Sequence, residues 1–126
     1  MFKRIFAATA VLALFAPPLA AQEMKAGQAG DEKAITGQVI DVNCYVAMGA
    51  SGAAHKACAE ACAKAGVQLA ILGTDGNLYA AISSKPMDAQ NAKLLPFAEG
   101  KVKVTGTHRF KNGLHTIEIK TIEAAT

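Results

Sequence analysis

The chain has 126 residues, with 13 basic and 10 acidic side chains and a formal net charge of +3. It has neither a lysine and arginine cluster nor basic residues interleaved with aromatic ones, which excludes the usual nucleic-acid-binding surfaces. A chain of this length is expected to form one domain, small enough that a disulfide or a metal ion would stabilise it usefully.

Residues 1 to 21 have the three parts of a secretory signal peptide, namely a basic start, an apolar run over residues 5 to 16, and small residues at Ala20 and Ala21. The apolar run is shorter than the roughly 20 residues that a membrane-spanning helix needs. We therefore expect cleavage after Ala21. The mature protein would have 11 basic and 10 acidic residues and no membrane span, and it would be periplasmic or secreted.

Residues 22 to 33 combine two glycines with mixed charges and lack apolar periodicity, which is typical of a flexible tether. A single domain is expected over residues 34 to 126. It opens with a strand over residues 34 to 46, where β-branched side chains are dense and Gly37 indicates a bulge or a sharp bend. This strand is expected to carry Cys44 at its end.

An alanine-rich helix is expected over residues 53 to 65, after a glycine-rich loop. Ser51 is the expected N-cap, and Gly66 is placed to end the helix. Positions three and four apart on a helix lie along one stripe. This stripe contains His55, Cys58 and Cys62.

Strands and turns alternate in the next part of the chain. Two strands are expected over residues 67 to 72 and 78 to 83, with an Asp-Gly turn between them. A short helix is expected to begin at Pro86, to run to about Phe97 and to be stopped by Gly100.

The last two strands are expected over residues 101 to 110 and 114 to 123, joined by the Asn112-Gly113 turn. A two-residue turn also determines which residues face each other across the hairpin. The expected pairs are Lys111 with Leu114, Phe110 with His115, and His108 with Ile117.

The expected order is strand, helix, strand, strand, short helix, strand, strand. Five strands with a helix between the third and the fourth are typical of the OB-fold. The predicted fold is therefore mainly β with helices. It is a five-stranded OB-like barrel with a cysteine-bearing helix inserted after the first strand.

A family resemblance rests on a Cys-Tyr pair, a helix motif and two further stretches. These are Cys44-Tyr45, then His55, Cys58 and Cys62, then D-G-N-L-Y at 75 to 79 and K-V-x-V-T-G at 101 to 106. In these features the chain resembles a loose class of small exported bacterial OB-fold-like proteins with a C-Y pair after strand one and an H-x-x-C-x-x-x-C helix. The resemblance implies the fold and does not imply an activity.

A metal site is the first of two hypotheses for the cysteine cluster. If Cys44 lies beneath the stripe of the helix, three thiols and the imidazole of His55 converge, which is a ligand set for zinc or Cu(I). A thioether from Met48 would favour copper. The sequence thus predicts a small exported metal-binding protein that holds a zinc or copper ion through Cys44, His55, Cys58 and Cys62.

A disulfide is the second hypothesis, because exported proteins meet an oxidising compartment. Cys58 and Cys62 lie four apart on one helix and would pair poorly, so Cys44 would bond to one of them and leave a spare thiol. The chain would then be a disulfide-stapled OB-like binding module without metal or catalysis. Its ligand, a protein, a peptide or a saccharide, would lie across the barrel face. The residues leave both hypotheses open.

No enzyme is expected, since the sequence has no Ser-His-Asp arrangement, phosphate loop or dinucleotide fingerprint. Thiol exchange would call for a C-x-x-C pair at a helix start, which is also missing. Asp41 and Asn43 flank the cluster without forming an acid/base pair. His108 and His115 are expected to form a partly buried, hydrogen-bonded pair rather than a second metal site.

Overall fold

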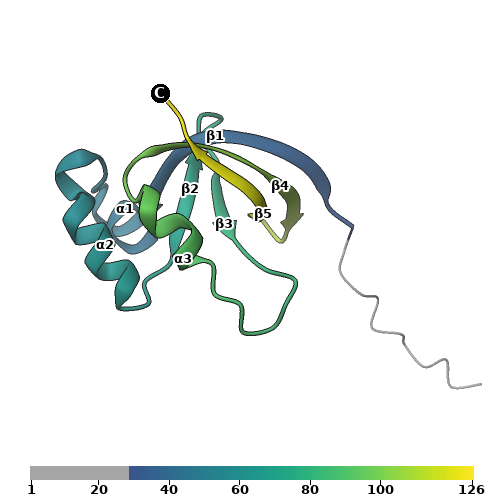
Figure 1. Cartoon of the computed structure of the whole chain (residues 1–126), viewed down its shortest axis with the longest axis horizontal. Coiled ribbons are helices and arrows are strands. Elements are labelled where there is room, and N and C mark those ends of the chain that lie inside the picture. Colours follow the sequence, from purple (N-terminus) through teal and green to yellow (C-terminus); the bar gives the residue numbers. More distant parts are fainter. Residues whose placement is uncertain (1–28) are drawn as a thin grey trace, which may run out of the picture.

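The computed structural model describes residues 29 to 126. The predicted signal peptide and residues 22 to 28 of the predicted tether lie outside the described residues. The described part of the chain forms a closed barrel in the strand order β1-β2-β3-β5-β4, with short helices beside it (Figure 1). The predicted five-stranded barrel with a helix after its first strand is therefore confirmed.

The strands are β1 (Asp31–Asp41), β2 (Leu69–Gly73), β3 (Leu78–Ala81), β4 (Lys101–Lys111) and β5 (Leu114–Ala124). The helices are α1 (Val42–Met48), α2 (Lys56–Lys64) and α3 (Asn91–Leu94), with the 3-10 turns η1 (Ala53–His55) and η2 (Leu95–Phe97). Strands β3 and β5 are parallel, and the other neighbouring strands are antiparallel. Within residues 29 to 126, no helix combines the length and the apolar character that crossing a membrane requires.

Strand β1 differs from the prediction at both of its ends. It begins at Asp31, so the last three residues assigned to the tether belong to the strand. It ends at Asp41, so Cys44 lies in helix α1 instead of at the end of the strand. The Asp41 side chain caps the start of α1, and Gly49, at φ 69°, ends it in the left-handed conformation that glycine adopts readily. These two caps outweigh the strand preference of the β-branched residues.

The other predicted helices are also shorter than expected. Gly52 precedes the turn η1, and no side chain caps that turn, so the predicted role of Ser51 is wrong. Helix α2 ends before Gly66, which has a φ of 99° and stops the helix as predicted. Helix α3 begins at Asn91 and not at Pro86. The Asn91 side chain bonds to the chain that leads into β2, which places α3 against that strand.

The β4–β5 hairpin has the predicted register. Asn112 and Gly113 have φ angles of 51° and 84°, as a tight two-residue turn between antiparallel strands requires. The three predicted pairs are present, namely Lys111 with Leu114, Phe110 with His115, and His108 with Ile117. A register shift occurs between Thr105 and Gly106, so the irregularity expected at Gly37 lies in a different strand.

Gly37 has a different role from the one predicted. It pairs with Gly73 of β2 on one side and with Val102 of β4 on the other, where β1 passes between its two neighbours. A Cβ atom at Gly37 would lie 2.3 Å from the Leu72 carbonyl oxygen, so only glycine fits this close approach of two strands.

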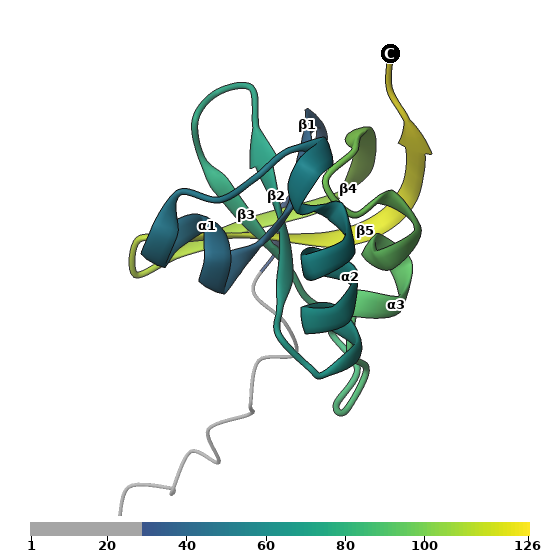
Figure 2. The same ribbon diagram turned by 90° about the vertical axis from the view of Figure 1, so that its left-hand side faces the viewer.

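The barrel encloses one apolar core, to which all five strands contribute. Leu94 of α3 and Ala63 of α2 add to this core from outside the sheet. Figure 1 shows α1 and α2 together on one side of the barrel, away from the tip of the β4–β5 hairpin. The same two helices face the viewer in Figure 2. That side of the barrel carries all three cysteines.

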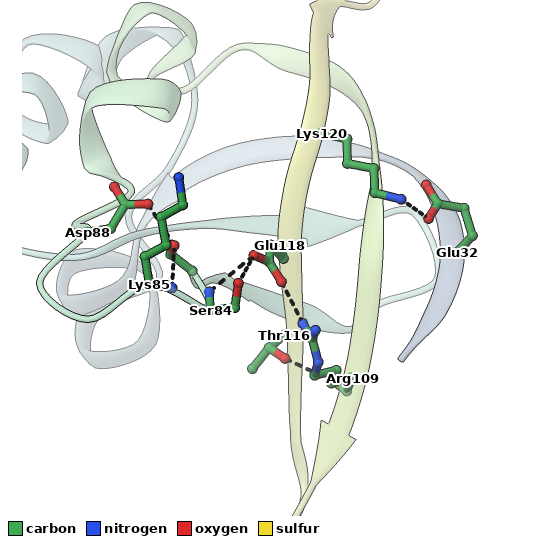
Figure 3. A network of polar contacts seen from close by, with 9 residues as sticks. Glu32, Ser84, Lys85, Asp88, Arg109, Thr116, Glu118 and Lys120 are labelled. Carbon is green, nitrogen blue, oxygen red and sulfur yellow. Dashed lines mark hydrogen bonds and ion pairs between the residues drawn. The ribbon is translucent and has the colours of Figure 1, made fainter. Parts of the chain in front are cut away.

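Glu118 on β5 links the loop after β3 to the β4–β5 hairpin (Figure 3). Its carboxylate accepts hydrogen bonds from the backbone N–H of Ser84 at 3.1 Å and from the Ser84 hydroxyl at 2.6 Å. It also pairs with Arg109 Nη1 at 3.0 Å. The hydrogen bonds from Ser84, and then the one from Arg109, lower the pKa of Glu118 to about 2.

Glu118 is expected to stabilise the folded chain less as the pH falls. The unfolded carboxyl titrates near its ordinary value of 4.5, so the folded carboxylate stabilises the protein above that pH and stops doing so as the pH approaches 2. The side chain is 27% exposed, so solvent screens the ion pair. Glu118→Gln should therefore cost about 1 kcal/mol in the free energy of unfolding at pH 7 and nothing near pH 2. Urea unfolding at both pH values tests this, and an equal cost at both would contradict it.

Candidate metal centre

Cys44 enters the site from the first turn of helix α1 and is 7% exposed. Its backbone N–H donates to Asp41 Oδ1 at 3.0 Å, and its carbonyl accepts from the N–H of Ala50 at 3.1 Å. Because both backbone groups are held, the Cys44 thiol has a defined position next to the end of β1.

The other three predicted ligands come from η1 and α2, as the helical stripe predicts. His55 ends the 3-10 turn, and Cys58 and Cys62 follow in α2. Ala59 and Ala63 of the same helix are buried, and α2 packs against β1. Cys58 is exposed, Cys62 is half-buried and Cys44 is buried, so the three thiols differ in their access to solvent.

Cys44 belongs to two groups of side chains whose ligand atoms lie within 4.8 Å of one another. The first group joins Cys44 to His55 and Cys58, and the second joins it to Asp41 and Cys62. All four predicted residues are thus brought together, although they do not form one group of four. Met48, the additional thioether candidate, is 70% exposed at the end of helix α1.

Asp41 is a member of the centre that the sequence argument passed over. The residue is fully buried, and its Oδ2 atom has no hydrogen-bond partner among the described residues. Burial favours the neutral acid, but the Cys44 N–H and the Cys62 thiol favour the carboxylate and lower the pKa of Asp41. A buried carboxylate oxygen without a partner is costly, and a cation would satisfy it. The position of Asp41 three residues before Cys44 is the feature of the sequence that could have indicated its place beside the cysteines.

Two of the thiols are held in their protonated form. Burial, followed by the charge of Asp41, raises the pKa of Cys44. Interaction with the Asp41 carboxylate, followed by burial, raises the pKa of Cys62 to about 12. A metal ion must therefore displace protons from these two residues in order to bind to them as thiolates.

Glu99 is the second functional side chain that the sequence argument missed. Its carboxylate is fully buried and lies 2.8 Å from Nδ1 of His55. It also accepts hydrogen bonds from the backbone N–H of Gly52 at 2.7 Å and from Nε2 of Gln38 at 3.0 Å. A histidine that donates from Nδ1 presents Nε2 as a neutral ligand, the usual arrangement behind a metal-bound imidazole. Glu99 lies 44 residues from His55, so no motif spacing could have revealed the pair.

All three cysteines are free in the structure, so it contains none of the disulfides of the second hypothesis. The predicted histidine pair is confirmed. His108 Nε2 and His115 Nδ1 lie 3.0 Å apart, both residues are half-buried, and neither belongs to a group of three potential ligands among the described residues.

Comparisons of this chain with family models, with curated proteins and with solved structures gave no match. The residues and their geometry therefore carry the functional argument.

Proposed function

We propose that this chain is a small exported metal-binding protein whose Cys44, His55, Cys58 and Cys62 hold a zinc or copper ion. The observation that carries the proposal is that Cys44 is shared by two groups of ligand atoms, each within 4.8 Å. Sulfur and imidazole nitrogen are the donors that zinc and copper prefer. The contact between Glu99 and His55 supports the proposal, because such a carboxylate orients a ligating imidazole.

The position of the centre favours a role in holding and transferring the ion. The apolar core of the barrel includes none of the four proposed ligands. Cys58 is exposed and the His55 side chain is 14% exposed, so an ion can be reached from solvent on this side. A centre that is buried on the side of Cys44 and open to solvent on the side of Cys58 suits storage or delivery better than it suits a purely structural role.

The test is to purify the protein from a bacterial periplasm without reducing agent and to measure its metal content, intact mass and free thiols. We expect an intact mass that corresponds to a chain beginning at Gln22. We also expect bound zinc or copper, and three free thiols once the metal is removed. The contrary result is a metal-free protein with one free thiol and a mass lower by two hydrogen atoms. That result would support the disulfide-stapled binding module instead.

Metal affinity is expected to rise with pH. The pKa of Cys44 is raised and that of Cys62 is about 12, so both thiols are protonated at neutral pH and release protons when a metal binds. Each proton released raises the affinity about tenfold per pH unit as long as the pH stays below the thiol pKa. Chelator competition across neutral pH measures this slope. An affinity that does not change with pH would contradict thiolate ligation.

A further inference from the structure

The proposed centre contains three thiols and one imidazole, a set that by itself accepts either zinc or Cu(I). Two buried carboxylates adjoin this set. Asp41 belongs to one of the two ligand groups, and Glu99 contacts His55 of the other. From these contacts we infer that Asp41 and Glu99 bias the centre toward a divalent cation, zinc, over monovalent Cu(I). This inference rests on the proposed function.

Asp41 has one carboxylate oxygen that a bound cation could use. Its Oδ1 atom is occupied by the Cys44 N–H, while its Oδ2 atom is buried and has no hydrogen-bond partner among the described residues. A carboxylate oxygen is a hard donor, which suits zinc and adds little for Cu(I), an ion that prefers soft sulfur. The unpartnered oxygen thus offers zinc an interaction that Cu(I) cannot use to the same extent.

The backbone at Glu99 is anchored to strand β1. Its N–H donates to the Val39 carbonyl at 2.9 Å, and the Val39 N–H donates to the Gly100 carbonyl at 3.0 Å, so the chain at Glu99 is bonded to β1 on both sides. Glu99 has a φ of 58°, a left-handed conformation that is uncommon for residues other than glycine. Such a conformation persists only where the surrounding structure holds it, and it often occurs at functional sites.

The carboxylate of Glu99 points at His55 as a result of this anchoring. It accepts from three donors, namely His55 Nδ1, Gln38 Nε2 and the Gly52 N–H, so a negative charge is stabilised behind the imidazole. That charge makes the imidazole a stronger donor to a metal.

Both carboxylates favour zinc over Cu(I) for the same electrostatic reason. Thiolate ligands already make the centre negative, and Asp41 and Glu99 add further negative charge in a buried setting where electrostatic interactions are strong. An ion of charge +2 gains about twice as much from this field as an ion of charge +1. Deprotonation of the thiols is required for both ions, so its cost largely cancels when their affinities are compared.

The experiment measures zinc and Cu(I) affinities by chelator competition for the full chain and for Asp41→Asn, Glu99→Gln and Glu118→Gln. Asparagine keeps an oxygen that can accept from Cys44, so Asp41→Asn should retain helix α1. Circular dichroism and melting of the metal-free proteins check their folding. Glu118→Gln is the matched control, because it neutralises a hydrogen-bonded carboxylate that belongs to neither ligand group.

The expected result is a zinc affinity that falls about 10- to 100-fold in Asp41→Asn and in Glu99→Gln, with a much smaller change for Cu(I). The control should bind both ions as the unmodified chain does. Equal losses for the two ions, or no loss for either, would overturn the inference and leave the metal centre in place. Absence of metal binding in the unmodified chain would instead remove the proposed function and the inference with it.

Discussion

Cys44→Ser is expected to reduce zinc or copper affinity at least about 100-fold. Structural zinc sites bind with about 10 to 16 kcal/mol through four ligands, so one lost thiolate is worth about 3 kcal/mol, or roughly two orders of magnitude. Cys44 is the one residue common to both ligand groups, so its loss disrupts both. Chelator competition gives the affinity, and the absorption of the cobalt-substituted protein reports thiolate ligation directly.

Cys58→Ser and Cys62→Ser are the matched controls, since each makes the same chemical change but leaves one group complete. Both should also lose affinity, and Cys44→Ser should lose the most because it breaks both groups. Cys44 is buried while Cys58 is exposed, so melting of each metal-free variant must show that the fold is retained. Equal affinities in Cys44→Ser and the unmodified chain would refute a shared role for Cys44.

Leu94→Ala is expected to cost about 2 to 5 kcal/mol in the free energy of unfolding. Leu94 is fully buried and is contributed by helix α3 to the core of the barrel. Truncation leaves a cavity that the surrounding strands can fill only in part, because a closed barrel has little freedom to collapse. Urea unfolding measures the loss, and the melting temperature should fall by more than about 8 °C.

The control for this prediction is Leu114→Ala, which removes the same atoms at a position that is 54% exposed. It should cost much less than Leu94→Ala, because little apolar surface returns to water. A similar cost for the two variants would show that Leu94 of α3 does not contribute to the core as its burial indicates.

The β4–β5 hairpin shows what local sequence is able to determine. Asn112-Gly113 selects a tight turn, and the alternation of apolar and polar residues in the two strands then leaves one register with a buried face. Turn chemistry and strand period depend on neighbouring residues, so the pairing of His108 with Ile117 was predictable. The same register places His108 and His115 close enough to form their hydrogen-bonded pair.

Helix α1 shows where local signals compete. The β-branched residues around Val42 favour a strand, whereas Asp41 and Gly49 are suited to the two ends of a helix. The structure resolves this conflict through the Asp41 cap and through a bond from the Val42 N–H to the Gln68 carbonyl. Gln68 lies directly before β2, far from Val42 along the chain, so residues 34 to 46 alone could not reveal where the strand ends.

The order of the five strands, the barrel class and the stripe of His55, Cys58 and Cys62 were predictable, because they follow from local period and spacing, whereas helix α1 was not predicted. Long-range contacts were needed to show that Cys44 joins the stripe from a helix, and that the carboxylates of Asp41 and Glu99 lie beside it. Glu99 reaches His55 because the segment before β4 bonds to β1 as the barrel closes. Contacts of that kind depend on pairing between distant parts of the chain, which spacing along a sequence does not encode.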